Sequence, residues 1–130
     1  MVARTNAGSL GVDTIRFRRG DWCQALDNER FDLIASNPPY IAFDDPHLRE
    51  GDLRFEPRAA LASGIDGLDA IRSIIEQSPA HLVSGGRLLL EHGSTQAEAV
   101  RGLLVHAGFA DIGSARDLEH RERVTYARLP

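Results

Sequence analysis

The segment Asn37-Pro38-Pro39-Tyr40 combines residue types that can hold a planar NH2 group in one orientation. The side-chain oxygen of Asn37 and the backbone carbonyl of Pro38 are two acceptors for the two N–H bonds of an amide or amine. Proline suits this role because its ring fixes φ and limits where the adjoining carbonyls can point. The ring of Tyr40 could lie against the planar group. We predict a site that aligns such a nitrogen with a methyl donor; the alternative is a proline-stiffened turn with a buried tyrosine.

A second polar loop, Gly20-Asp21-Trp22, has residue types suited to an adenine base. The carboxylate of Asp21 could accept a hydrogen bond from the exocyclic amino group, and the indole of Trp22 could cover the ring. The alternative is a turn carboxylate beside a partly buried tryptophan. We favour the ligand, because this loop and Asn37 both follow predicted strands. In open α/β sheets, ligands bind beyond the carboxyl ends of the strands.

Three further polar residues lie near these loops, and their roles are less specific. His92, in Glu91-His92-Gly93, ends another predicted strand, and we interpret it as a structural loop residue rather than a catalytic one. Glu56 and Arg58 belong to a long loop. They either order that loop through charge-assisted hydrogen bonds or contact the substrate, and the sequence does not separate these two roles.

No residue pattern predicts a metal site. Asp44 and Asp45 resemble a metal-binding pair, but a solvated turn is the better interpretation. Cys23 is the single cysteine, so neither a disulfide framework nor a cysteine-rich zinc site is expected. The histidines are scattered, without a pair at a metal-ligand helical spacing: His47, His81, His92, His106 and His120.

Hydrophobic periodicity predicts alternating strands and helices. We expect helices over residues 2–10, 68–79 and 96–107, and strands over residues 15–19, 31–36, 87–91, 109–118 and 122–129. Residues 31–36 are mostly apolar, as in a strand buried on both faces of a parallel sheet. Gly85-Gly86 predicts a turn, and Ser94 or Thr95 a helix cap. This order predicts a mostly parallel α/β sheet with an antiparallel C-terminal edge. The loop over residues 41–67 is long enough to be either functional or disordered.

Composition is that of one soluble domain. The chain has 130 residues and a formal net charge of −4, which argues against a dedicated nucleic-acid-binding protein. Arg16, Arg18 and Arg19 form a small basic cluster that we interpret as the solvated face of an edge strand. No apolar run approaches the roughly 20 residues of a membrane span, and no signal-peptide core is visible at the N-terminus. We therefore expect a cytoplasmic protein without membrane contact.

Taken together, these segments resemble the HemK/PrmC family of protein-glutamine methyltransferases, release-factor-specific branch. The resemblance runs almost from end to end, and it is most specific in Gly51-Asp52-Leu53-Arg54-Phe55-Glu56-Pro57-Arg58 and Leu88 to Gly93. Further matches are Val2 to Ala7, Phe17 to Trp22, Phe31 to Ile41, Gly64 to Asp69 and Glu122 to Thr125. It implies a Rossmann-like class I methyltransferase fold and S-adenosylmethionine as methyl donor. The implied substrate is the glutamine of the Gly-Gly-Gln motif in peptide chain release factors.

The resemblance also assigns roles to site residues. It implies that Asn37 and Pro38, with Pro39, bind the substrate glutamine and that Tyr40 is its aromatic neighbour. Asn37, Pro38 and Tyr40 are the implied catalytic residues. Asp21 and Trp22 are implied contacts on the adenine side of the donor, and Asn37 also borders the donor.

The sequence departs from the family at its start. Members carry an N-terminal helical domain, a first strand ending in a glycine-rich loop, and a second strand ending in a ribose-binding acid. None of these is found here, so we expect residues 1–130 to form a single, partial methyltransferase catalytic domain with impaired S-adenosylmethionine binding. The family strand order, 3-2-1-4-5-7-6, would leave residues 31–36 as an apolar sheet edge. Residues 15–19 could dock on it, another chain could cover it, for example by self-association, or the chain could be unstable alone.

Two other functions are compatible with the motifs. Asn-Pro-Pro-Tyr is shared with DNA adenine N6 methyltransferases, but the acidic net charge and the lack of a target-recognition region count against that activity. The chain could also be a non-catalytic interaction module, which the missing glycine-rich loop favours. Binding of S-adenosylmethionine would distinguish an enzyme from such a module.

Overall fold

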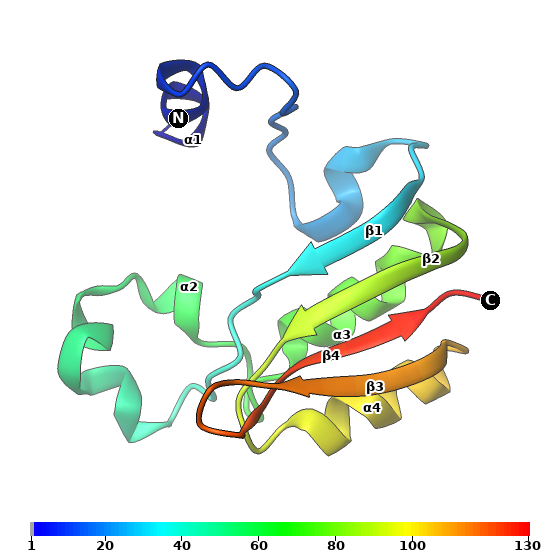
Figure 1. The fold of residues 1–130 in the computed structure, drawn as a ribbon. Coiled ribbons are helices and arrows are strands. Elements are labelled where there is room, and N and C mark those ends of the chain that lie inside the picture. Colours follow the sequence, from blue (N-terminus) through cyan, green and yellow to red (C-terminus); the bar gives the residue numbers. More distant parts are fainter. Residues whose placement is uncertain (1) are drawn as a thin grey trace.

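Four strands form one mixed sheet in the order β1-β2-β4-β3 in the computed structural model, which describes residues 2–130 (Figure 1). The strands are β1 (Phe31–Ser36), β2 (Leu82–Glu91), β3 (Ala110–Arg116) and β4 (Glu122–Arg128). β1 and β2 are parallel, and β4 is antiparallel to both β2 and β3. The predicted α/β class and the antiparallel C-terminal edge are confirmed. The prediction of a mostly parallel sheet is wrong for residues 2–130, because β1 and β2 are the only parallel pair of strands there.

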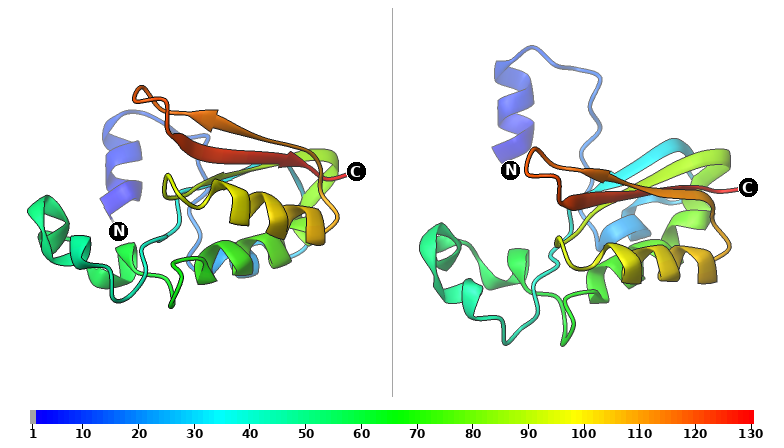
Figure 2. Two further views of the ribbon diagram at one scale, coloured as in Figure 1. Left: turned by 90° about the horizontal axis from the view of Figure 1, so that it is seen from below. Right: turned by 60° about the horizontal axis from the view of Figure 1, so that its bottom comes forward.

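Two amphipathic helices, α3 (Asp69–Gln77) and α4 (Ala97–His106), cover one face of this sheet (Figure 2). Their apolar residues recur every three or four positions, which gives each helix one buried stripe. The stripes pack on alternate residues of the central strands, and together they form the core: Ile71, Ile74, Ile75, Leu82, Leu88, Leu90, Val100, Leu104 and Ala127. No helix among residues 2–130 is long and apolar enough to cross a membrane.

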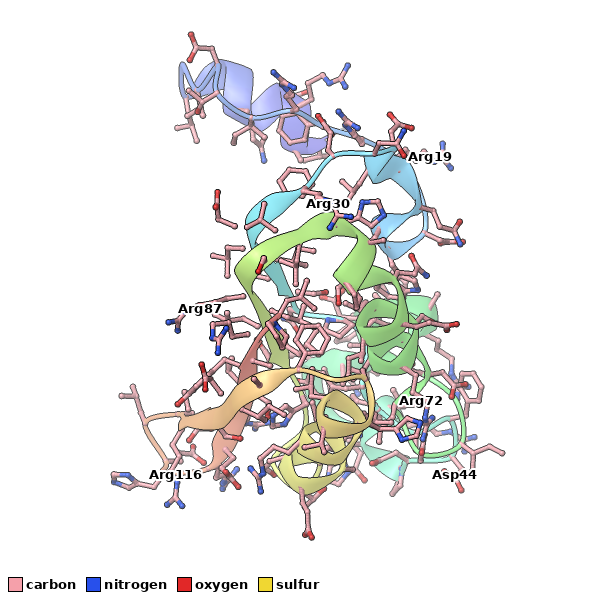
Figure 3. The ribbon with its side chains drawn as sticks, turned by 90° about the vertical axis from the view of Figure 1, so that its right-hand side faces the viewer. Arg19, Arg30, Asp44, Arg72, Arg87 and Arg116 are labelled. Carbon is pink, nitrogen blue, oxygen red and sulfur yellow. The ribbon has the colours of Figure 1, made fainter. Side chains whose placement is uncertain are left out.

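The opposite face of the sheet carries no helix within the described residues. Strand register places Leu33, Arg87 and Arg128 in one row across this face, and Leu33 is 53% exposed. Arg87 projects from it, away from α3 (Figure 3). Tyr126 lies against Gly113, where a Cβ would come within 2.5 Å of the tyrosine hydroxyl. This face is therefore amphipathic and open.

The predicted strand over residues 15–19 is wrong. These residues belong to an irregular linker that follows α1 (Val2–Ser9) and joins no sheet. α1 lies apart from the sheet at the end of this linker (Figures 1 and 2). A strand needs a neighbour to satisfy its backbone groups, and here Arg16 and Arg18 contact Glu29 through ion pairs at 3.6 and 2.7 Å instead. Apolar and charged residues alternate over residues 15–19, but no strand lies beside them to form a sheet.

β1 is an edge strand, and it is not buried on both faces as predicted, because Leu33 is 53% exposed. It pairs with β2 along one side, and the register is irregular between Phe31 and Leu33. The prediction that this edge would be uncovered is confirmed for residues 2–130. Docking of residues 15–19 onto it, one of the three expected outcomes, does not occur. Self-association through the edge stays a prediction.

Two local boundaries were also wrong. Gly85-Gly86 lies within β2, which begins at Leu82 rather than at Arg87. The pairing with β1 is nevertheless irregular between Leu82 and Arg87, and the ladder with β4 begins at Arg87, where the strand was predicted to start. Gly85 adopts a φ of +80° and donates its N–H to the carbonyl of Leu129 at 2.8 Å, so the glycine permits an irregularity while pairing continues. At α4, Gln96 is the N-cap residue in place of Ser94 or Thr95, and no side chain caps the helix.

The segment over residues 41–67 is ordered by short helices. It contains the 3-10 helices η2 (Pro46–Arg49) and η3 (Gly51–Phe55) and the helical turn α2 (Arg58–Leu61). A parallel bridge closes it, since the Ile41 N–H donates to Leu61 at 2.9 Å and the Ser63 N–H donates to Ile41 at 2.8 Å. Two further 3-10 helices lie elsewhere, η1 (Trp22–Leu26) and η4 (Ser78–His81).

The turn between β3 and β4 depends on the carboxylate of Asp117. This side chain accepts the N–H groups of Glu119 and Arg121 at 2.9 and 3.0 Å and the guanidinium of Arg123 at 3.1 Å. These bonds, the one from Arg121 first, hold the pKa of Asp117 below its usual 3.8. A lowered pKa contributes stability that is present above the unfolded value and is lost as pH falls through the folded value.

We therefore expect Asp117→Asn to lower the melting temperature at neutral pH, and expect the difference from the parent chain to shrink as pH falls below 3.8. Thermal unfolding followed by circular dichroism across this range measures the effect. Asp32→Asn, at an exposed carboxylate of β1, is the control. A difference between Asp117→Asn and the parent that is the same at every pH would contradict the assigned role.

Candidate functional site

The chain leaves β1 through Asn37-Pro38-Pro39, at the carboxyl edge of the sheet. Two prolines end the strand because neither has an N–H to donate to a ladder. Pro38 is buried, whereas Asn37 is exposed. No hydrogen bond among residues 2–130 uses the side chain of Asn37 or the carbonyl of Pro38. The two acceptors that the sequence singled out are therefore held on a stiff backbone and are free to take N–H donors.

Tyr40 is half-buried between the ends of β1 and β2. Its ring packs against the hydrophobic core, and its hydroxyl donates to Glu91 Oε1 at 3.3 Å. Burial, and then the neighbouring carboxylate of Glu91, raise the pKa of Tyr40. The phenol therefore stays protonated at neutral pH and acts as a donor. Tyr40 lies beside Asn37 and Pro38 as predicted, but its hydroxyl is already committed to the protein.

Gln96 is a residue of this region that the sequence analysis missed. Its Oε1 accepts the Gly93 N–H at 2.8 Å, and its Nε2 donates to the carbonyls of Tyr40 and Asp66 at 2.9 and 3.2 Å. One side chain thus joins the loop after β1, the loop after β2 and the loop before α3. The available signal was a glutamine three residues after Gly93, in the loop that follows a strand.

His92 is fully buried beside this cluster. Its Nδ1 lies 2.9 Å from the carbonyl of Gly93 and its Nε2 lies 2.7 Å from Thr125 Oγ1. A carbonyl can only accept, so Nδ1 carries a proton and, in the neutral ring, Nε2 accepts from the threonine hydroxyl. Thr125 is in turn 3.1 Å from Ser114. Neither ring nitrogen is free for a substrate, which agrees with the interpretation of His92 as a structural residue rather than a catalytic one.

The charged residues of the segment over residues 41–67 bind mainly to that segment. Arg58 donates to the carbonyl of Phe43 at 3.1 Å, which favours an ordering role for this arginine. Glu56 is exposed. Asp45 accepts the His47 N–H at 2.9 Å and faces His47 Nδ1 at 2.7 Å, which lowers the pKa of Asp45 and raises that of His47.

Asp44 is exposed on the same segment. Within residues 2–130, no group of three or more histidine, cysteine, aspartate or glutamate side chains could hold a metal ion.

Asp21 and Trp22 lie at the start of η1, where the linker meets the body of the fold. Trp22 has a φ of +51°, unusual for a bulky residue, and is 40% exposed. Asp21 is exposed, and its carboxylate does not cap η1. Both side chains are thus available to a ligand, as the prediction requires.

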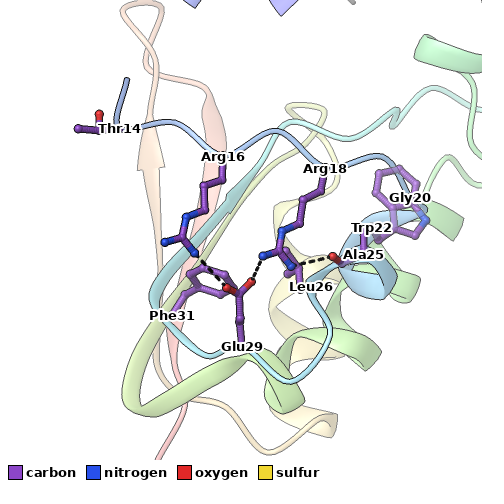
Figure 4. Close-up of a pocket in the computed structure, with 9 residues that line it drawn as sticks. All are labelled: Thr14, Arg16, Arg18, Gly20, Trp22, Ala25, Leu26, Glu29 and Phe31. Atoms are coloured by element: carbon purple, nitrogen blue, oxygen red, sulfur yellow. Dashed lines mark hydrogen bonds and ion pairs between the residues drawn. The ribbon is translucent and has the colours of Figure 1, made fainter. Parts of the chain in front are cut away.

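A cavity of about 520 Å³ borders Trp22 between the linker and β1 (Figure 4). This volume suits a small molecule. The ion pairs of Arg16 and Arg18 with Glu29 cross it, and Phe31 forms part of its wall. Neither Asp21 nor Asn37 lines it. The structure therefore does not join the two predicted halves of the site in one cavity.

Comparison with known proteins shows what the sequence is similar to. No protein-family model matches the chain. The chain is 56% identical over 99% of its length to the release factor glutamine methyltransferase of Xylella fastidiosa strain Temecula1, covering 47% of that protein. It is 49% identical over 98% of its length to the release factor glutamine methyltransferase of Escherichia coli strain K12, covering 46%.

Over almost its whole length the chain is similar to release factor glutamine methyltransferases. It spans about half the length of the curated relatives it matches. The resemblance drawn from the motifs is thereby confirmed.

Solved structures support the fold. A release-factor-specific protein-(glutamine-N5) methyltransferase from Alicyclobacillus acidocaldarius matches with a TM-score of 0.50 and 27% identity, covering 77% of this chain and 49% of that one. TrmN from Thermus thermophilus matches with a TM-score of 0.59 over 99% of this chain and 32% of that one. At 23% identity the TrmN match bears on the fold alone. The four-stranded mixed sheet is thus part of a methyltransferase architecture.

Proposed function

We propose that this chain supplies the substrate-amide half of an enzyme that methylates the side-chain nitrogen of glutamine in the Gly-Gly-Gln motif of release factors. The observation that carries this proposal is the pair of unpartnered acceptors, Asn37 Oδ1 and the Pro38 carbonyl, at the end of β1. An amide nitrogen is a poor nucleophile because its lone pair is delocalised. Two acceptors that hold its two N–H bonds orient the nitrogen and stabilise the positive charge that develops on it.

Release factors fit this site as partners because the glutamine side chain ends in a planar NH2 group. Tyr40 supplies the neighbouring wall, and its bond to Glu91 keeps that wall in place. The relatives named above act on release factors according to their names. A release factor substrate in turn implies a cytoplasmic reaction.

S-adenosylmethionine is the methyl donor we propose, and when bound it supplies the methyl group. Asp21 and Trp22 fit its adenine end, since a free carboxylate and an exposed indole are present there. We propose that residues 1–130 are one part of a single Rossmann-like catalytic domain and that the remaining donor contacts belong to the half of the relatives that this chain does not cover. The open edge of β1 is where that part, or a second copy of the chain, would pair.

The test is a chimera in which this chain replaces the matching 47% of the Xylella fastidiosa relative. We expect the chimera to transfer a labelled methyl group from S-adenosylmethionine to a release factor, with the label on the Gly-Gly-Gln glutamine by mass spectrometry. Calorimetric titration of S-adenosylmethionine into the chain and into the chimera shows how much of donor binding this half provides. A chimera that binds the donor and leaves the release factor unmodified would overturn the proposal.

A further inference from the structure

We propose that Gln96 is a positioning residue for the glutamine-binding loop, a role that rests on the function proposed above. Its side chain lies at the meeting point of three segments and bonds to each of them. The contacts are Gly93 N–H to Oε1 at 2.8 Å, Nε2 to the Tyr40 carbonyl at 2.9 Å, and Nε2 to the Asp66 carbonyl at 3.2 Å. We do not propose that Gln96 contacts the substrate.

The contact with Tyr40 is the one that bears on the substrate. Tyr40 lies two positions after Pro38 and three after Asn37, so holding its carbonyl limits the rotation of the backbone that carries both acceptors. On the other side, the Ile41 N–H donates to Leu61 at 2.9 Å. The peptide between Tyr40 and Ile41 is thus held at both of its polar atoms. The free carbonyl of Pro38 keeps one direction for that reason.

Two glycines leave room for this arrangement. Gly67 has a φ of +77°, and a Cβ there would overlap the carbonyl oxygen of Tyr40 and come within 2.9 Å of Gln96 Nε2. A Cβ on Gly93 would lie 3.0 Å from Gln96 Oε1 and 3.7 Å from the ring of Tyr40. The backbones of the two neighbouring loops therefore approach Gln96 and Tyr40 as closely as they do because both residues lack side chains.

The chemistry of the three partners requires an amide at position 96. Two of them are carbonyls, which need donors, and the third is an N–H, which needs an acceptor. A glutamine offers two N–H donors and one acceptor oxygen on one planar group, and here all three are used. A carboxylate would keep the bond from Gly93 but would direct negative charge at two carbonyl oxygens. An apolar side chain of equal length would leave all three groups without this partner.

Other bonds hold the two loops that contain Gly93 and Asp66. The Gly93 carbonyl lies 2.9 Å from His92 Nδ1 and accepts the Gln96 N–H at 3.0 Å. Asp66 is fixed by its own side chain, which accepts the Leu68 N–H at 3.0 Å and pairs with Arg72. Gln96 therefore links the loop after β1 to two loops that are themselves held by other bonds.

The test compares Gln96→Glu and Gln96→Met in the chimera defined above, with Thr95→Glu as the matched control. Thr95 is exposed, so that variant adds the same charge one residue away. We expect both Gln96 variants to reduce kcat/KM for the release factor by about 10²-fold, the scale of a misplaced reacting group. Donor affinity should stay at its parent value, because the loop assigned to adenine is elsewhere. The control should match the parent.

The pH profile separates positioning from a general loss of structure. Protonation of the carboxyl introduced by Gln96→Glu restores one hydrogen-bond donor. The activity of this variant relative to the parent should therefore rise as pH falls. Gln96→Met has no such group and should show no rise. Hydrogen exchange at the Gly93 amide in the 130-residue chain gives a readout without activity. We expect faster exchange in Gln96→Met than in Gln96→Glu.

The outcomes distinguish the two proposals. An inactive parent chimera with normal donor binding would refute the glutamine methyltransferase function, whatever Gln96 does. If the parent chimera were active and both Gln96 variants matched its activity, with unchanged exchange at the Gly93 amide, only the positioning role would be refuted. If Gln96→Glu and Gln96→Met lost activity equally at every pH, Gln96 would be a structural residue and the proposal would also fail.

Discussion

Asn37→Ala should lower kcat of the chimera for release factor methylation by about 10²–10³-fold, the range for removing one preorganised hydrogen-bonding group at a reacting centre. The substitution removes one of the two acceptors proposed to hold the substrate NH2 group. Because the Asn37 side chain is exposed and makes no hydrogen bond within residues 2–130, its loss should leave the free energy of unfolding within about 0.5 kcal/mol of the parent value. Initial rates of methyl transfer and urea unfolding measure the two quantities.

Asn28→Ala is the matched control for this prediction. Asn28 is also exposed, but it lies after η1 and away from the end of β1. Its substitution should change neither the rate nor the stability. A normal rate with Asn37→Ala would show that this side chain does not hold the reacting nitrogen, and the assignment of the whole loop would then have to be revised.

Gly67→Ala should produce the largest loss of stability at the site, about 2–5 kcal/mol. Two causes add. The φ of +77° is a left-handed conformation that costs an alanine about 1–2 kcal/mol. In addition, the new Cβ would overlap the carbonyl oxygen of Tyr40, a backbone atom that cannot move without moving the loop after β1. Urea unfolding of the 130-residue chain, followed by circular dichroism, measures the total.

Gly108→Ala separates these two causes. Gly108 has a similar φ of +84°, but a Cβ there would have no atom within 4 Å. This variant should therefore lose only the conformational part, about 1–2 kcal/mol. Equal losses at the two positions would mean that the loop relaxes freely around Gly67, which would contradict a stiff backbone at Tyr40.

Several features followed correctly from residue types and periodicity. α3 and α4 were predicted within a few residues, because their apolar residues recur at helical spacing over two or three turns. The sheet class followed from the alternation of strands and helices. The end of β1 at Asn37 followed from the two prolines, whose missing N–H groups act locally. The family followed from motifs spread along the chain.

The errors arose where a local pattern depended on a distant partner. Residues 15–19 alternate like a strand, yet no strand is available to pair with them, and their arginines bind Glu29 instead. Gly85-Gly86 has the composition of a turn. Both residues nevertheless fall within β2, and Gly85 donates its N–H to the carbonyl of Leu129, a residue distant along the chain. The cap predicted at Ser94 or Thr95 is at Gln96 instead, and the Gln96 side chain bonds to two other loops rather than to the helix.

What the sequence by itself determined is the chemistry at the end of β1: an amide oxygen and a proline carbonyl on a backbone whose φ angles are restricted by covalent rings. That information is local and needs no fold. The tertiary structure decided that these acceptors stay free while Tyr40 does not, because Glu91 and Gln96 reach it across 51 and 56 residues of chain. It also decided that the cavity beside Trp22 is lined by neither Asp21 nor Asn37. Such contacts depend on which segments the core brings together, and most residues of the core are distant from Asn37 along the chain.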